Sequence, residues 1–183
     1  MIILASKSPR RRELLRAAGF TFKVVPPEKG EVAPENAPPE ETVMTLARRK
    51  AREALEKYPD GIIIGADTVV VCGGAVLGKP ADKDDAFNML KTLSGRRHYV
   101  YTGVSVTRGG IEETFYRKTE VEFFPLSDEE TSAYIQTGEP FDKAGAYGIQ
   151  GAGMLLVKGI TGDFYNVMGL PIGVLSRKLK KFL

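Results

Sequence analysis

The sequence has only one cysteine, Cys72, and one histidine, His98, among its 183 residues. A single cysteine excludes an internal disulfide and fits a reducing compartment, and its place in an apolar strand predicts an inert core thiol. A single histidine at the start of an expected strand is predicted to be structural and argues against a Ser–His–Asp triad. Without a cluster of cysteine and histidine ligands, any bound metal should be a hard, oxygen-liganded ion such as Mg²⁺.

Long apolar runs and strong charge are also missing. No run approaches the roughly 18 apolar residues of a membrane helix, and no signal-peptide pattern opens the chain, so no membrane partner is expected. Neither a P-loop nor a dinucleotide-binding fingerprint stands in a strand–helix context. The formal net charge is +3 and the basic residues are dispersed, which argues against a dedicated nucleic-acid binder.

The sequence has an ordinary globular composition, and its hydrophobic pattern predicts both strands and helices along the chain. We expect strands over residues 2–5, 20–25, 62–72, 75–77, 99–107, 111–123 and 154–158. We expect helices over residues 9–18, 40–57, 82–93, 128–138 and 167–183. This mixture predicts a single domain, residues 1–183, with an α/β or α+β fold around one twisted sheet.

The first expected helix begins with charges of the wrong sign. Ser8 is a suitable N-cap and Pro9 suits the first helical position. A helix start carries a partial positive charge that favours acidic residues, yet Arg10, Arg11 and Arg12 fill the first turn. This arrangement makes sense if an external polyanion supplies the missing charge.

Helical phase separates these arginines. Arg10 and Arg11 lie beside the apolar stripe and are expected to face a cleft, whereas Arg12 is expected to point to solvent. A basic surface helix is the alternative interpretation. The preceding turn, residues 6–8, adds serine hydroxyls and backbone donors and therefore favours a phosphate site.

Asp67 interrupts a strand that is apolar enough to be covered on both faces. An unpaired buried carboxylate costs several kcal/mol, so it should bind a metal, meet a cation or have a shifted pKa. The alternative is an aspartate at a strand end or bulge, which Gly65 would allow. We favour a catalytic or metal-binding role.

Lys50 lies in the middle of the apolar stripe of the helix expected over residues 40–57. Such a lysine either extends its amine to solvent or reaches an anion, here as a second phosphate ligand. Four charged residues elsewhere on the helical wheel are expected to be solvated: Arg48, Arg49, Arg52 and Glu53.

Three loop residues add weaker signals. Glu31 lies in a loop long enough to be functional, although most glutamates in such loops are simply exposed. Lys79 follows a short hairpin after Asp67 and has the alternative of an ordinary turn lysine. Gln150 lies in the glycine-rich loop 142–153, whose backbone can approach a flat ligand, and its amide can pair with a base edge.

Six segments, in order and at compatible spacing, resemble the Maf family. They are SKSPRR (6–11), ARRKA (47–51), GADT (65–68), GKP (78–80), DKAGAYGIQG (142–151) and VMGLP (167–171). The resemblance implies a two-lobed mixed α/β fold shared with the inosine triphosphate pyrophosphatases, with a long twisted mixed sheet and an active-site cleft between the lobes. It also implies a cytoplasmic nucleoside triphosphate pyrophosphatase that needs a divalent cation, Mg²⁺ or Mn²⁺, and forms a homodimer.

The resemblance also implies roles for single residues. Asp67 would accept a proton from the attacking water and, with Glu31, hold the metal. The phosphate-binding residues would be Ser6, Arg10, Arg11, Lys50 and Lys79. Arg10, Thr68 and Gln150 match the positions that mark the branch acting on dTTP and UTP.

The implied role is removal of excess or noncanonical nucleotides, including modified pyrimidine nucleotides, as a hydrolase of nucleotide metabolism. The substrate would be a small-molecule nucleotide, cleaved to the monophosphate and pyrophosphate. A non-enzymatic nucleotide-binding regulator is the alternative, because the family is also associated with septum formation and division arrest.

Overall fold

The computed structural model describes residues 1–30 and 32–183. The chain divides into two compact units. The first unit holds residues 1–68, 102–117 and 169–183, and the second holds residues 69–101 and 118–168. Glu31 lies outside the described residues.

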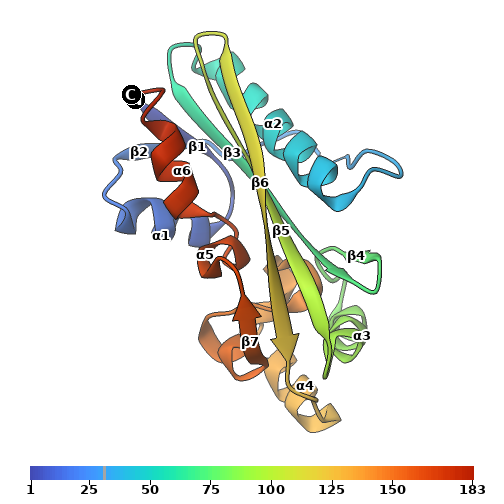
Figure 1. The fold of residues 1–183 in the computed structure, drawn as a ribbon. Helices are drawn as coiled ribbons and strands as arrows, with labels where there is room; N and C mark the ends of the chain where they lie inside the picture. The colour runs from blue at the N-terminus through green and yellow to red at the C-terminus, as the bar shows by residue number, and fades with distance from the viewer. Residues whose placement is uncertain (31) are drawn as a thin grey trace. The chain divides into compact units, whose positions relative to one another are not determined.

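One mixed sheet carries the fold, with the strand order β2-β1-β3-β5-β6-β7 and with β4 paired to β3 off this path (Figure 1). Its strands are β1 (Ile2–Ala5), β2 (Phe22–Val24), β3 (Ile62–Cys72), β4 (Ala75–Leu77), β5 (Arg97–Arg108), β6 (Ile111–Phe123) and β7 (Val157–Thr161). β1 is parallel to β2 and β3, whereas β4 and β7 pair antiparallel to β3 and β6. The predicted mixture of helices and strands around one sheet is confirmed.

Six α-helices accompany the strands in the described part of the chain: α1 (Pro9–Ala17), α2 (Pro39–Lys57), α3 (Lys83–Leu93), α4 (Asp128–Gln136), α5 (Phe164–Val167) and α6 (Ile172–Leu179). Three short 3-10 helices join them: η1 (Glu139–Asp142), η2 (Ala144–Ala146) and η3 (Gly151–Leu155). None of the described helices is long and apolar enough to cross a membrane.

In the first unit, α2 packs very closely on the sheet. A Cβ atom at Gly65 of β3 would lie 2.2 Å from the Ala47 carbonyl oxygen, and one at Gly103 of β5 would lie 2.4 Å from that of Val43. Both glycines therefore allow the helix backbone to approach the strands. Apolar side chains of β1 and β3, such as Ile3 and Ile63, fill the remaining contact.

In the second unit, a ring cluster lies at the centre of the core. His98, Phe123 and Tyr147 meet edge to face with centroids 4.7 to 5.3 Å apart. His98 is fully buried, so its predicted structural role is confirmed. Cys72 is a buried free thiol in the same core, as predicted.

Two predicted elements were wrong. The expected final helix, 167–183, is interrupted after α5, because Gly169 adopts a φ of 103° and Pro171 disfavours a helical residue before it. The expected strand 154–158 begins instead as the 3-10 helix η3, and β7 starts only at Val157. The break after α5 has this local cause, whereas the start of η3 is held by a distant residue, as described below.

Candidate functional site

Asp67 and Lys50 form a buried ion pair in the first unit. Lys50 Nζ donates to Asp67 Oδ1 at 2.6 Å, and the two residues are only 8% and 5% exposed. Lys50 reaches β3 because α2 approaches the strand at Gly65, two residues before the aspartate. Asp67 was predicted to bind a metal, meet a cation or have a shifted pKa, and the structure shows that it meets a cation. Lys50 was predicted to reach solvent or an anion, and the anion that it reaches is the Asp67 carboxylate.

Arg11 holds the backbone around Asp67. Its guanidinium donates to the carbonyl oxygen of Gly169 (2.7 Å), the carbonyl oxygen of Ala66 (2.8 Å), the hydroxyl of Thr68 (2.9 Å) and the hydroxyl of Ser6 (3.3 Å). Ala66 and Thr68 are the two neighbours of Asp67 in the chain. The buried guanidinium therefore fixes β3 on both sides of the carboxylate.

The Thr68 hydroxyl has two protein partners in the first unit. It accepts from Arg11 and shares a hydrogen bond of 2.9 Å with the Thr102 hydroxyl of β5. Thr68 is half-buried. Its orientation is thus set by the protein before any ligand arrives.

The start of α1 has the predicted cap. Ser8 accepts from the Arg11 backbone N–H through its hydroxyl, and Pro9 is the first helical residue. Ser6 is buried, and its hydroxyl also accepts from the Ser8 N–H at 3.1 Å. Arg12, expected to point to solvent, is half-buried and donates to the backbone carbonyl oxygens of residues 7 and 8.

Arg10 and Arg11 differ in exposure on this helix turn. Arg11 is 8% exposed, whereas Arg10 is half-exposed. No acidic residue occupies the first turn of α1. Arg10 is therefore the arginine of this pair that an external anion can reach more easily.

Helix α2 also holds the loop that precedes it. The Glu53 carboxylate accepts from the backbone N–H groups of Glu28 (2.6 Å) and Lys29 (3.2 Å), and Arg49 donates to the Val32 carbonyl oxygen. Glu53 is 8% exposed, so its predicted solvation was wrong. Its burial follows from the loop that folds onto the helix, which a helical wheel does not include.

A pocket of about 280 Å³ lies between this loop and α2. Four cationic side chains contribute to its lining: Lys29, Arg49, Lys50 and Arg52. Two carboxylates, Glu53 and Glu56, lie among them. In the sequence, Glu31 lies between Lys29, whose N–H group binds Glu53, and Val32, whose carbonyl oxygen binds Arg49. Glu31 is the predicted metal ligand and lies outside the described residues.

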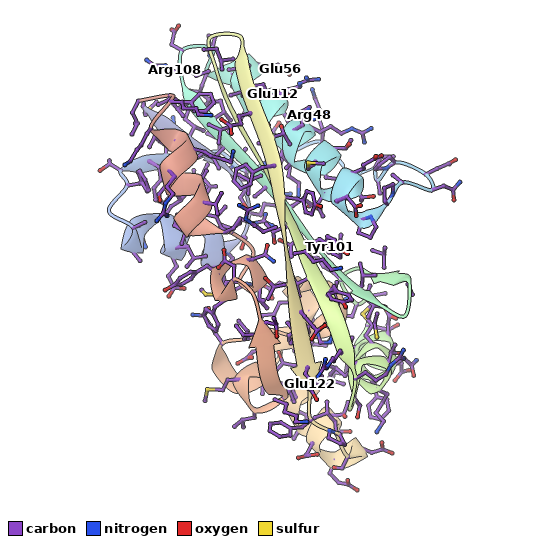
Figure 2. The ribbon with its side chains drawn as sticks, in the orientation of Figure 1. Arg48, Glu56, Tyr101, Arg108, Glu112 and Glu122 are labelled. Atoms are coloured by element: carbon purple, nitrogen blue, oxygen red, sulfur yellow. The ribbon has the colours of Figure 1, made fainter. Side chains whose placement is uncertain are left out.

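Ion pairs also join α2 to β6, and Figure 2 labels Arg48 and Glu112 of this group. Glu112 lies 2.9 Å from Arg48 Nε and 3.1 Å from Arg52 Nε. Both arginines were expected to be solvated, and Arg52 is indeed largely exposed. Such surface pairs contribute little stability each.

The donor chemistry at Asp67 fits a hard cation. Among the described residues, no group of three His, Cys, Asp or Glu side chains is placed to hold a metal. Mg²⁺ does not require such a group, because it is usually bound by one or two carboxylates together with phosphate oxygens and water. A buried carboxylate such as that of Asp67 satisfies this requirement.

The second unit holds the other predicted residues. Lys79 is exposed in the turn after β4, and Gln150 is exposed at the start of η3. The two loops are joined, because the Gly145 N–H donates to the Gly78 carbonyl oxygen at 2.9 Å. Six predicted residues thus lie in the first unit, namely Ser6, Arg10, Arg11, Lys50, Asp67 and Thr68, and two lie in the second.

Sequence reasoning missed the residues that hold the glycine-rich loop. The Tyr134 hydroxyl accepts from the Gly148 N–H at 3.0 Å, and the Glu139 carboxylate accepts from the N–H groups of Ala152 and Gly153. An acidic residue at the end of a helix, just before a glycine-rich loop, is the only sequence signal for Glu139. That signal is too common to identify a partner.

His98 is unsuited to acid–base chemistry near neutral pH. Burial lowers the pKa of His98 to about 4, and its Nε2 lies 2.7 Å from the Tyr147 hydroxyl. Burial also raises the pKa of the Tyr147 hydroxyl, so both groups are neutral at pH 7. The pair instead holds one end of the glycine-rich loop against the core.

Comparison with known proteins decides the family. A family model described as Maf-like protein matches residues 1–182. The chain belongs to the Maf family. This confirms the resemblance seen in the six sequence segments.

Two curated relatives match almost the whole chain. One from Carboxydothermus hydrogenoformans is 52% identical over 184 residues, covering 99% of this chain and 98% of the relative. One from Bacillus velezensis is 50% identical over 181 residues, covering 99% and 96%. Both relatives are named dTTP/UTP pyrophosphatase.

A solved HAM1 protein from Coxiella burnetii has a similar fold. It aligns with a TM-score of 0.55 at 15% identity and covers 98% of each chain. At this identity the likeness concerns the fold alone. Together with the mixed sheet, it confirms the fold class expected for this Maf-family chain.

Proposed function

We propose that this Maf-family chain is a nucleoside triphosphate pyrophosphatase that hydrolyses dTTP, UTP and modified pyrimidine nucleotides to the monophosphate and pyrophosphate. The observation that carries the proposal is the buried Asp67 carboxylate, held by Lys50 and flanked by the two residues that Arg11 binds. Relatives about 50% identical over 99% of the chain, named dTTP/UTP pyrophosphatase, support it. A regulator that only bound nucleotide would not need this buried base.

Asp67 acts in the proposed reaction as the base. Its carboxylate takes a proton from water, the water oxygen bonds to the α-phosphorus, and the bond from that phosphorus to the bridging oxygen breaks to release pyrophosphate. The neighbouring ammonium of Lys50 offsets the cost of burying the charged base. Rigid placement by Arg11 provides the positioning that phosphoryl transfer chiefly requires.

A divalent cation, Mg²⁺ or Mn²⁺, would be held by Asp67 and Glu31. When bound, the ion supplies positive charge to the triphosphate. Hard oxygen donors suit either ion. Glu53 and Arg49 attach the described residues 28, 29 and 32 to α2, which supports a metal ligand contributed from this loop.

Cationic groups would neutralise the phosphate charge. We assign this role to Arg10 at the start of α1 and to Lys50, with the backbone of the turn at residues 6–8. Lys79 of the second unit joins them on the family resemblance. Ser6 and Arg11 would take part as well, and all three side chains, Ser6, Arg11 and Lys50, also bind protein atoms, as described above.

Base selection would fall to Arg10, Thr68 and Gln150, which match the marker positions of the dTTP/UTP branch. The exposed Gln150 amide offers a donor and an acceptor to a pyrimidine edge. On the same resemblance, residues 1–183 work as one domain, in a cytoplasmic homodimer. The role would be removal of unwanted nucleotides from the pool.

A pyrophosphate-release assay tests the proposal. The wild-type chain should release pyrophosphate from dTTP and UTP faster than from purine triphosphates, and only with Mg²⁺ or Mn²⁺. Asp67→Asn should lower kcat by about 100-fold or more with the fold retained by circular dichroism. The matched control is Asp60→Asn, an exposed aspartate just before β3, which should keep full activity. Near-normal turnover by Asp67→Asn would remove Asp67 from the chemistry.

A further inference from the structure

Glu139 acts as a cap for a helix that it does not belong to. It opens η1, and its half-buried carboxylate accepts from the N–H groups of Ala152 (2.9 Å) and Gly153 (3.3 Å) at the start of η3. Within the described part of the chain, η3 has no side-chain cap of its own, because Gln150 makes no capping bond. The distant carboxylate therefore satisfies donors that a local cap would normally take.

Tyr134 holds the same loop on the other side of Gln150. Its buried hydroxyl accepts from the Gly148 N–H at 3.0 Å. Tyr134 lies in α4 and Glu139 opens η1 shortly after it, so both residues come from neighbouring helical segments of the second unit. The backbone is thus fixed two residues before and two residues after Gln150.

The carboxylate also lies directly against the loop. Gly151 has a φ of 64°, and a Cβ atom there would come within 2.4 Å of Glu139 Oε1. The positive φ favours glycine, and a Cβ atom would force the Glu139 carboxylate to shift. Gln150, one residue earlier, is exposed, and its side chain is not engaged as a cap.

We infer that Glu139 and Tyr134 are positioning residues for base selection, which hold the Gln150 amide in the orientation that reads a pyrimidine. The inference rests on the proposed function, in which Gln150 contacts the base. A planar amide selects a base edge only if its donor and acceptor face the right atoms, and two main-chain attachments around it supply that restriction. A loop without them would still permit hydrolysis but would discriminate less between bases.

Substrate selectivity tests this inference. The measurement is the ratio of kcat/KM for dTTP and for UTP to kcat/KM for GTP. Glu139→Gln keeps the size of the side chain, but its amide can accept only one of the two N–H donors, and the ratio should fall by about tenfold. The loss should come from a higher KM for the pyrimidine nucleotides, with KM for GTP little changed.

Two further variants keep the test independent of folding effects. Tyr134→Phe removes only the hydroxyl and should lower the ratio by about fivefold. Glu129→Gln changes an exposed glutamate of α4 and is the matched control, with an unchanged ratio expected. An unchanged ratio in both Glu139→Gln and Tyr134→Phe would overturn the inference.

A double variant separates positioning through Gln150 from a general structural role. If Glu139 acts through the amide, Glu139→Gln should cause no further loss of selectivity in a Gln150→Ala background. Independent, multiplying losses would overturn the inference while leaving the proposed function intact. A wild-type chain that hydrolyses none of the nucleotides would instead overturn the proposed function.

Discussion

Lys50 Nζ lies 2.6 Å from Asp67 Oδ1, and both side chains are buried. The lysine comes from α2 and the aspartate from β3, so the pair joins the helix to the strand that carries the proposed base. A buried charge that loses its partner is strongly destabilising, whereas loss of both partners costs much less. The pair thus couples the stability of the first unit to its proposed chemistry.

Lys50→Met should therefore destabilise the fold by about 3–5 kcal/mol, because it leaves the Asp67 carboxylate buried without its cation. Urea unfolding at pH 7 measures this change. The double variant Lys50→Met with Asp67→Asn should be more stable than Lys50→Met alone. Equal stability of the two variants would show that the Asp67 carboxylate is not costly to bury once Lys50 is replaced, which would contradict this prediction.

Arg11→Lys should lower stability by about 2–4 kcal/mol, because an ammonium cannot satisfy the carbonyl oxygens of both Ala66 and Gly169 together with the Thr68 hydroxyl. We expect kcat for dTTP to fall with it, since the backbone around Asp67 is less restricted. Thermal unfolding and steady-state kinetics measure the two effects. Arg16→Gln, an exposed residue of the same helix, is the control and should change neither.

Glu53→Gln should weaken the response to Mg²⁺, because the loop that carries Glu31 loses a charged acceptor for two of its N–H groups. The half-saturating Mg²⁺ concentration should rise by about tenfold, as is typical when a residue that supports a metal ligand is changed. Glu41→Gln, exposed at the start of α2, should leave it unchanged. If the half-saturating Mg²⁺ concentration of Glu53→Gln equals that of the wild-type chain, the bonds from Glu53 to this loop do not contribute to metal binding.

His98 should make the fold sensitive to acid. Its pKa falls from 6.5 to about 4 on burial, so the neutral ring is the form that the core accepts. This stability contribution is fully present above pH 6.5 and is lost as the pH falls toward 4. We expect the free energy of unfolding to drop by up to about 3 kcal/mol over this interval. The His98→Gln variant should not show this loss of unfolding free energy between pH 7 and 4. A pH dependence identical to that of the wild-type chain would contradict the assignment of the loss to His98.

Local signals in the sequence predicted many elements correctly. The Ser8 cap and the strands expected over residues 62–72 and 75–77 each depend on residues close together in the chain, and each appears in the structure. Asp67 and Lys50 were detectable because a charge in an apolar stripe requires a partner. Their pairing with each other required the close approach of α2 at Gly65, which no local pattern contains.

The errors at η3 and Glu53 depend on a partner that lies far away in sequence, whereas the break before α6 has a local cause in Gly169 and Pro171. The break before α6 exposes the Gly169 carbonyl oxygen to Arg11, and the first turn of η3 is completed by Glu139. Glu53 is buried by a loop that precedes its helix. Periodicity and propensity describe neighbours along the chain, so none of these contacts could be inferred from them.

The glycine at position 65 has a consequence that reaches beyond packing. Any larger residue there would meet the Ala47 carbonyl oxygen at 2.2 Å and the Ala51 nitrogen at 2.7 Å, and α2 would have to lift from the strand. The lysine ammonium would be carried out of range of the carboxylate, although neither charged residue had changed. One absent methyl group thus controls whether the two opposite charges of this centre can meet.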